Sequence, residues 1–345
     1  MVFFDKMNRR VLRAAGVFSF FALVIVIAFP LNSEEYQDVP LRVASVPVIG
    51  DMQRAVATKA DLYDNTPAFV SYPDVRGVLD ALHAEEVDVV SSGPLWFVRH
   101  VLRTHGDGTG DLPVILATNF NSFSVHALLV RQSDGIKTLA DLEGARVART
   151  LGVATEYLVA QMAATTDLNP ETLVFVDMDI SEARFALSDG RVDAVLTWEP
   201  ITSAWLQDET LGFQRAEGAG DAEVSWFLMT RRSVLEARRE ALVAYLTALE
   251  KAETRYYADP VQALGMIEDE FDLLPDSASA VYDNFDFNLS LSPTILIALQ
   301  AAEAWLCQRE ALPGCGKVQW VQFVEPDLVR QVLPMGTVRF RSATP

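Results

Sequence analysis

The feature that constrains the fold most is the regular alternation of short apolar runs with amphipathic stretches between residues 41 and 230. The first run, Leu41–Val48, is rich in β-branched residues and is followed by Gly50, a pattern typical of a strand. The other predicted strands are Val87–Ser91, Val114–Ala117, Ala127–Val130, Ala145–Ala148, Thr172–Val176, Val192–Thr197 and Ser225–Met229. The predicted helices between them are Asp74–His83, Leu95–Arg103, Ala154–Thr165, Ser181–Leu187 and Ile201–Leu206. Such alternation favours an α/β fold with parallel sheets and helices on their faces.

The pattern changes after Thr230. The stretches Arg231–Asp259, Pro260–Phe271 and Thr294–Cys307 have helical periodicity, and we expect no comparable strands between them. The C-terminal third is therefore predicted to be helical.

Two segments resemble each other in the order helix, tight turn, buried strand, loop, helix. The first contains Ala81-Leu82, Val87-Asp88, Val90 and Pro94. The second contains Ala186-Leu187, Val192-Asp193, Val195 and Pro200. Chance matches of this length are common, but a true repeat would place two similar strand ends in two similar units.

Three loops are candidates for a ligand site, because ligands of open α/β sheets bind beyond the carboxyl ends of strands. Two of them are the loops of the repeated segments, Ser91-Ser92-Gly93-Pro94 and Thr197-Trp198-Glu199-Pro200. The third, Thr150–Thr155, precedes a predicted helix whose first N–H groups and dipole suit an anionic group. The plain alternatives are ordinary strand–helix turns with proline at the first helical position, and a simple N-cap.

The N-terminal segment differs from the rest of the chain. Residues 1–33 hold four basic side chains and one acidic one, and no charged residue occurs between Ala14 and Ser33. A basic start before the apolar run Val17–Phe29 is typical of an export signal. The uncharged stretch is also long enough to span a bilayer, and no clear cleavage site precedes Glu34. We therefore expect a signal peptide or a retained membrane anchor, with a slight preference for the anchor.

Charge and composition exclude several classes of function. Of 345 residues, 28 are basic and 47 acidic, so the net charge is −19; the N-terminal segment carries +3 and the rest −22. A nucleic-acid-binding role is excluded by this acidity, and two cysteines and four histidines exclude zinc-finger and iron–sulfur classes. Cys307 and Cys315 either pair in an oxidising compartment or remain half-buried thiols. The histidines, His83, His100, His105 and His126, show no metal-binding spacing, so no metal is expected.

The order of motifs resembles the periplasmic substrate-binding proteins of ABC importers, in the nitrate/sulfonate/taurine and thiamine-precursor branch. The resemblance rests first on His126–Arg131, Gly135–Ala148, Gly152 and Leu168–Val174. It rests also on the last motif of the series, formed by Ala186-Leu187, Gly190–Ala194 and Trp198-Glu199-Pro200. It covers about residues 41–255 and is weaker towards the C-terminus, where Val324-Glu325-Pro326 fits.

The resemblance implies a type II periplasmic binding protein fold, with two α/β lobes joined by two crossing segments. The crossings are expected near His126–Arg131 and Trp226–Thr230. One lobe would then combine residues 41–127 and 229–345, and the other would be 128–228. The ligand-contacting positions carried over are Pro47, Val48, Ser92, Gly93, Asn119, Phe120, Gly152, Val153, Ala154, Thr155, Trp198, Glu199 and Trp226. No lysine occurs between Lys59 and Lys137, which disfavours small inorganic anions such as nitrate.

The function implied is capture of a small organic solute, of sulfonate, carboxylate or pyrimidine/thiamine-precursor type, in a cleft between the lobes. We expect a monomer without a cofactor, located in the periplasm or on the outer face of the cytoplasmic membrane, that delivers the solute to an ABC permease and its ATPase. The main alternative is a ligand-sensing module that signals to a membrane kinase or cyclase. An enzyme on this fold is a weaker alternative, because related pyrimidine-precursor synthases use a cysteine-rich motif that this chain lacks.

Overall fold

The computed structural model describes residues 39–46, 51–122, 125–150, 154–218, 224–271, 279, 282, 286–291 and 294–333. The predicted signal or anchor at 1–33 lies outside these residues, as do the predicted site positions Pro47, Val48, Gly152 and Val153. Within the described ranges, no helix combines the length and the apolar character needed to cross a membrane.

The described chain forms two sheets, and the larger has the strand order β11-β4-β10-β3-β1-β2. Its strands are β1 (Arg42–Ser45), β2 (Ala68–Ser71), β3 (Val89–Ser92), β4 (Pro113–Ser122), β10 (Val224–Arg231) and β11 (Asp286–Ser290). The strands β1, β2 and β3 are parallel, whereas β10 runs antiparallel between β3 and β4. We call this sheet A.

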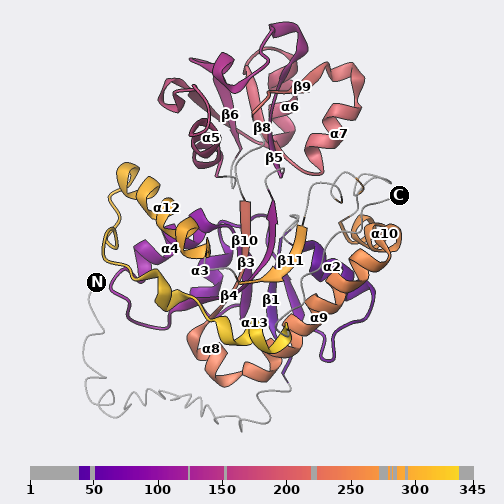
Figure 1. The fold of residues 1–345 in the computed structure, drawn as a ribbon, viewed down its shortest axis with the longest axis vertical. Helices are drawn as coiled ribbons and strands as arrows, with labels where there is room; N and C mark the ends of the chain where they lie inside the picture. Colours follow the sequence, from indigo (N-terminus) through magenta and orange to yellow (C-terminus); the bar gives the residue numbers. More distant parts are fainter. Residues whose placement is uncertain are drawn as a thin grey trace, which may run out of the picture. The chain divides into compact units, whose positions relative to one another are not determined.

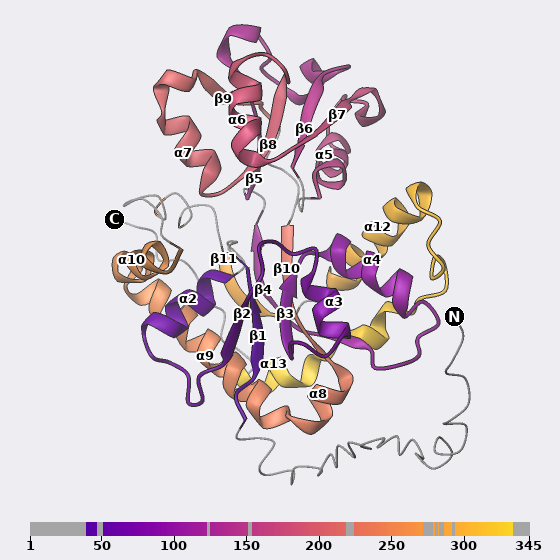
Figure 2. The same cartoon turned by 180° about the vertical axis from the view of Figure 1, so that it is seen from behind.

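Helices cover both faces of sheet A. Successive side chains of its strands point to opposite faces, and both sets are apolar and buried. In Figures 1 and 2, α3 (Val78–His83), α4 (Pro94–Thr104) and α12 (Thr294–Arg309) lie on one flank. The other flank carries α2 (Met52–Lys59), α9 (Arg239–Ala258) and α10 (Pro260–Phe271). Val89 and Leu228 pack in the core under α2 and α9, and their neighbours Val90 and Met229 pack in the core under α3 and α4. This period of two is that of a strand buried on both faces.

The second sheet, which we call sheet B, has the order β7-β6-β8-β5-β9. Its strands are β5 (His126–Arg131), β6 (Arg146–Thr150), β7 (Val174–Met178), β8 (Ala194–Trp198) and β9 (Phe213–Arg215). Its helices are α5 (Thr155–Ala163), α6 (Ile180–Ser188) and α7 (Ile201–Gln207). The α/β fold class expected from the alternating pattern is therefore confirmed. The expectation of parallel sheets was wrong, because β10 runs antiparallel to its neighbours in sheet A and β5 does so in sheet B.

The repeated segment in the sequence corresponds to a repeated contact in the structure. The carboxylate oxygen Oδ2 of Asp88 accepts hydrogen bonds from the backbone N–H (2.9 Å) and Nε (3.2 Å) of Arg42, and Oδ1 accepts from Nη2 (2.6 Å). Asp193 accepts the same three bonds from Arg146, at 2.8, 3.0 and 2.8 Å. In both sheets the aspartate thus ties the start of one parallel strand to the start of its neighbour.

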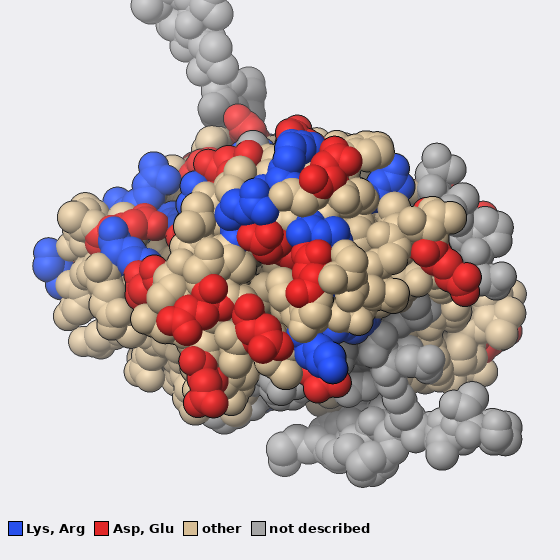
Figure 3. Space-filling model, turned by 90° about the horizontal axis from the view of Figure 1, so that it is seen from above, with Lys and Arg blue, Asp and Glu red and all other residues tan. Residues whose placement is uncertain are grey.

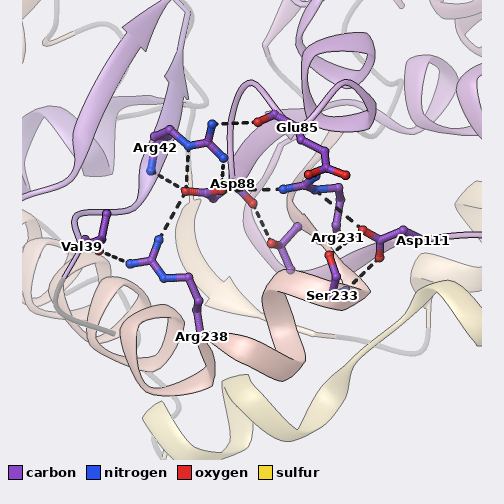
Figure 4. A network of polar contacts seen from close by, with 9 residues as sticks. Val39, Arg42, Glu85, Asp88, Asp111, Arg231, Ser233 and Arg238 are labelled. Atoms are coloured by element: carbon purple, nitrogen blue, oxygen red, sulfur yellow. Dashed lines mark hydrogen bonds and ion pairs between the residues drawn. The ribbon is translucent and has the colours of Figure 1, made fainter. Parts of the chain in front are cut away.

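The contact in sheet A is more deeply buried than the one in sheet B, and more arginines surround its aspartate. Asp88 is 1% exposed and also lies 3.4 Å from Nη1 of Arg238 and 3.8 Å from Nη2 of Arg231. Figure 4 shows these arginines converging on the carboxylate from different elements. Arg238 additionally donates to the carbonyl of Val39. The network joins β1 and β3 to β10 and to the start of α9.

The chain changes sheets between Ser122 and His126 and again between Arg215 and Val224. Both changes precede the predicted crossing segments, which are regular strands. His126 already pairs with Trp198 in sheet B, and Val224 already pairs with Ser122 in sheet A. The apolar runs at these points therefore mark strands of the two sheets rather than the crossings. The division into two lobes remains a proposal, with its limits at these sheet changes.

Several elements were missing from the sequence prediction: α2, β2, β9 and β11. The strand β11 is an exception to the expectation of no strands after Thr230. Its sequence lacks a run of β-branched residues, and it is held by pairing with the edge of β4 and by a hydrogen bond of 2.8 Å from the Leu289 amide to Glu253. Its Phe287 packs edge-on against Phe120 of β4, with the ring centroids 6.4 Å apart.

The C-terminal part is helical as predicted and contains a disulfide. Besides α9, α10 and α12 it includes α8 (Arg232–Ala237) and α13 (Pro326–Val332). Cys307 in α12 is bonded to Cys315, with their Cα atoms 5.8 Å apart. Of the two alternatives left open by the sequence, the structure therefore selects the pair.

Candidate functional site

Serine hydroxyls lie at the carboxyl end of β3, the first predicted site element. Ser91 and Ser92 are 3% and 0% exposed. They pair in register with Leu228 and Phe227 of β10. Among the described residues, neither hydroxyl has a hydrogen-bond partner. A buried hydroxyl without a partner costs free energy, so each of these groups is a candidate for a hydrogen bond to a bound molecule.

An aromatic wall stands beside these serines. The ring of Trp226 stacks on Phe120, with centroids 6.1 Å apart and an interplanar angle of 14°. A Cβ on Gly93 would lie 3.5 Å from the Trp226 ring, which is ordinary contact distance, so the indole packs against the start of α4. The Trp226 Nε1–H is buried and has no partner among the described residues. It therefore adds a third donor to the same strand ends.

Asn119 is placed at the same end of sheet A by an irregularity in β4. Trp226 pairs with Phe120 and Phe227 pairs with Thr118, so Asn119 is the extra residue of a bulge. Bulges re-aim side chains and are frequent beside functional sites. Asn119 is 2% exposed. Ser92, Gly93, Asn119, Phe120 and Trp226 thus form one group, which we call the sheet A half-site.

The corresponding end of sheet B carries two threonines. Thr150 ends β6 and Thr155 begins α5; they are 5% and 1% exposed, and within the described chain neither hydroxyl has a partner. Ala154 is the N-cap of α5 and supplies no side-chain cap. The first turn of this helix therefore presents N–H groups beside two hydroxyls, an arrangement suited to an oxyanion.

Trp198 and Glu199 end β8 in the same sheet, but they differ in what they can offer a ligand. Glu199 is fully buried: Oε1 accepts from Nη2 of Arg215 at 2.7 Å, and Oε2 accepts from the backbone N–H of Ser203 at 3.1 Å. Its carboxylate thus serves the first turn of α7, which was the plain alternative at sequence level. Trp198 is half-buried and pairs in register with His126. With Ala154, Thr150 and Thr155, these residues form the sheet B half-site.

His126 lies next to the crossing between the sheets and was not among the predicted contacts. Burial lowers the pKa of its imidazole to about 4. Its Nδ1 has no hydrogen-bond partner among the described residues. The histidine is therefore neutral at physiological pH and leaves one ring nitrogen available.

Sequence reasoning missed His126 as a site residue. Ser91 and Thr150 lie in two of the loops that the sequence marked as candidates, although the resemblance did not carry them over as ligand contacts. His126 lacked a signal of this kind, because its position at the start of β5 acquires meaning only from the pairing with Trp198.

The sheet A unit also contains a cavity of about 210 Å³, lined by Leu41, Tyr63 and Tyr245 among others. Leu41 precedes β1, so this cavity lies at the amino ends of the parallel strands. The half-site described above lies at their carboxyl ends, where ligands of such sheets bind. The cavity is therefore not the candidate site.

Three histidines come together away from these half-sites. His83, His100 and His105 each offer one ligand atom, and these atoms all lie within 4.8 Å of one another. Their spacing in the sequence gives no metal-binding signature, because the three rings become neighbours only in the folded chain. The residues come from two helices that pack side by side.

A comparison with family models decides the family. Residues 76–263, more than half of the 345-residue chain, match the family described as NMT1/THI5 like. The chain belongs to this NMT1/THI5-like family. The branch indicated by the sequence motifs is thereby confirmed.

The chain is similar to a protein of Escherichia coli strain K12 that is named as an aliphatic sulfonates-binding protein. It is 28% identical over 155 residues, which are 40% of this chain and 42% of the relative. The match thus spans about two-fifths of the relative's length.

Solved structures of sulfonate-binding proteins share the fold. The alkanesulfonate-binding protein SsuA from Xanthomonas axonopodis pv. citri, bound to MOPS, has a TM-score of 0.68 at 18% identity, covering 83% of this chain and 98% of that one. The periplasmic aliphatic sulphonate binding protein SsuA from Escherichia coli has a TM-score of 0.70 at 18% identity, covering 88% and 97%. The periplasmic binding protein fold is therefore confirmed. The desulfurization enzyme DSZB is also similar, with a TM-score of 0.60 at 13% identity, so the fold alone does not separate binding from catalysis.

Proposed function

We propose that this NMT1/THI5-like chain is an extracytoplasmic solute-binding protein that captures a small organic solute between two lobes and delivers it to an ABC importer. The observation that carries the proposal is a set of buried polar groups that have no partner among the described residues. They are Ser92, Trp226, Thr150 and Thr155 in the two half-sites, and Ser91 next to the first. Native proteins rarely leave such groups unpaired, and a bound solute would satisfy them.

The chemistry of these groups favours a solute with acceptor oxygens and an apolar part. Hydroxyls, an indole N–H and the first turn of α5 all donate hydrogen bonds, and donors of this kind suit a sulfonate or carboxylate. The stacked rings of Phe120 and Trp226 offer an apolar wall to the remainder of the molecule. Of the three solute classes considered, the sulfonates fit this combination best, and the names of the relatives agree with that choice.

The acceptor group would be held by local donors rather than by a basic surface. Acidic and basic side chains are interspersed on the face drawn in Figure 3, and the chain as a whole carries a net charge of −19. A field of this sign does not attract an anion. Affinity for a sulfonate must therefore come from the hydrogen bonds of the half-sites.

Covalent connectivity supports a site shared by the two half-sites. Phe120 of sheet A and His126 of sheet B are six residues apart, so the chain between them spans at most about 21 Å. His126 pairs with Trp198. The ring of Tyr157 in α5 lies 5.5 Å from that of Trp305 in α12, which gives a second link between the sheets. A solute that contacts both lobes would favour their closed arrangement by its differential affinity.

The location, partners and anchor belong to the same proposal. The basic and apolar segment 1–33 would export the chain or hold it at the outer face of the cytoplasmic membrane. The solute-loaded monomer would then dock on a permease driven by its ATPase. N-terminal sequencing of the protein from membrane and soluble fractions tests whether the segment is retained. If the segment is cleaved, it is missing from the protein in both fractions.

The solute is identified most directly by mass spectrometry of small molecules released when freshly purified protein is denatured. We expect a stoichiometric compound with a sulfonate or carboxylate group. Recovery of a pyrimidine would redirect the assignment to the thiamine-precursor class. Chemical conversion of the recovered compound by the refolded protein would contradict a pure binding role.

A further inference from the structure

The three histidines noted above form a compact cluster on the sheet A unit. His83 ends α3, His100 lies in α4, and His105 directly follows α4. The ring centroids are 5.7 Å apart for His83 and His100, 5.3 Å for His83 and His105, and 6.0 Å for His100 and His105. Each ring therefore contacts both of the others.

Two of the rings are oriented by a second group. Nδ1 of His100 lies 3.3 Å from Oδ1 of Asp80, and Nδ1 of His105 lies 3.1 Å from the carbonyl oxygen of Thr109. A histidine that donates from one nitrogen to a carboxylate or a carbonyl presents the lone pair of the other to a metal. The nitrogen left to both His100 and His105 is Nε2.

The burial of the cluster suits a ligand set with one open side. His100 and His105 are 7% and 4% exposed, whereas His83 is exposed. The exposed His83 leaves a path for an ion to enter.

The end of α4, next to His105, is held in place by the loop that contains Gly314. The Gly314 amide donates to the carbonyl of Leu102 at 3.0 Å, and a Cβ on Gly314 would lie 2.8 Å from Cα of Gly106. Gly314 lies in the loop closed by the disulfide between Cys307 and Cys315. This loop therefore packs against the end of α4, on the backbone before and after His105.

We propose that His83, His100 and His105 bind one divalent transition-metal ion of the zinc type, with a solvent molecule in the fourth position. Zinc–nitrogen bonds of about 2.0–2.1 Å in a tetrahedral site place ligand nitrogens about 3.4 Å apart. In the structure the ligand nitrogens lie up to 4.8 Å apart. Metal binding would therefore require side-chain movements of about 1 Å, which the exposed His83 can supply.

The metal would join α3 to α4 and is separate from the solute. The helix α4 begins beside Gly93 of the sheet A half-site and has 11 residues. Its length is about 16 Å at the usual rise, so His105 lies that far from the solute donors. The inference thus goes beyond the proposed function and does not depend on it.

The test is a titration of the purified full chain, prepared without a polyhistidine tag and stripped with a chelator, with Zn²⁺ alone. We expect one ion per chain and a rise in Tm on its addition. His83→Ala, which removes an exposed ligand and should still fold, should weaken Zn²⁺ binding at least 10-fold. Asp80→Asn should weaken it about 10–100-fold, because it removes only the orienting group of His100. His126→Gln serves as the control and should bind Zn²⁺ as the wild type does.

Cobalt substitution distinguishes a built site from loose surface binding. One Co²⁺ per chain should give the visible absorption of a tetrahedral ion in the wild type, and this band should be lost in His83→Ala. Stoichiometric binding by the wild type that is unchanged in both His83→Ala and Asp80→Asn would overturn the assignment. Failure of the wild type to bind Zn²⁺ at micromolar concentration would overturn it as well.

Discussion

Arg42 holds Asp88 through its backbone amide and its guanidinium at once, so that both carboxylate oxygens are engaged by one residue. The same contact recurs between Arg146 and Asp193 in the other sheet. The repeat preserves the way in which two parallel strands are joined at their starts. The two copies differ in burial, since Asp88 is 1% exposed and the Asp193 side chain is 25% exposed.

Asp88→Asn should destabilise the protein far more than Asp193→Asn. Removing the charge of Asp88 leaves the buried Arg238 without the carboxylate it faces, and breaking a buried pair costs about 3–5 kcal/mol. The Asp193 side chain is 25% exposed, so solvent screens its loss and the cost should be about 1 kcal/mol. Urea unfolding of both variants measures the difference. Equal losses would contradict the role assigned to the arginines around Asp88.

Removal of the disulfide should lower the free energy of unfolding by about 2–3 kcal/mol, as expected for a loop of this length. Denaturant unfolding of the oxidised wild type, the reduced wild type and the double variant Cys307→Ser/Cys315→Ser measures this effect. The reduced wild type and the double variant should unfold at the same denaturant concentration, below that of the oxidised wild type. A double variant as stable as the oxidised protein would show that the bond does not restrain the loop at Gly314.

Stability should fall as the pH is lowered from about 6.5 to about 4, partly because of His126. The folded protein holds the pKa of this imidazole at about 4, below its ordinary value of 6.5. In this window the unfolded chain binds a proton that the folded chain does not, so unfolding is favoured, by up to about 3 kcal/mol at the lower end.

The contribution of His126 is isolated by comparison with His126→Gln, since other groups titrate in the same window. The variant should lose less stability than the wild type between pH 7 and pH 4.5. Parallel pH profiles of the two proteins would be incompatible with a His126 that stays neutral in the folded chain.

Trp198→Ala should abolish the rise in Tm on solute binding without unfolding the protein. The indole is half-buried at the end of β8, so its loss opens the sheet B half-site and leaves the core intact. Trp205→Ala is the control, because this ring packs on Phe213 and has no proposed contact with the solute. Solute binding unchanged in Trp198→Ala would remove Trp198 from the site.

The sequence predicted the alternating α/β pattern and the strand ends, because apolar periodicity and proline positions are local signals. It placed Ser92, Gly93 and Thr155 correctly at strand and helix ends for the same reason. The strand β11 was missed since its stability comes from pairing with β4 rather than from its own residues. The cluster of His83, His100 and His105 was missed because its members become neighbours only when α3 packs on α4.

Glu199 shows a different limit of prediction from the sequence. Its sequence position beside Trp198 fits a ligand contact and a helix start equally well. Only the observed bonds from Arg215 and from the Ser203 amide decide how the carboxylate is used.

The central claim is that one solute is held by donors from both sheets. Isothermal titration with a short alkanesulfonate tests it most directly, using Ser92→Ala for sheet A, Thr155→Val for sheet B, and Ser188→Ala, at an exposed position, as control. Loss of a hydrogen bond to a charged group costs about 1.5–3 kcal/mol, so each of the first two variants should bind at least 10-fold more weakly. The control should bind as the wild type does. Unchanged affinity in either Ser92→Ala or Thr155→Val would contradict a site shared by the two sheets.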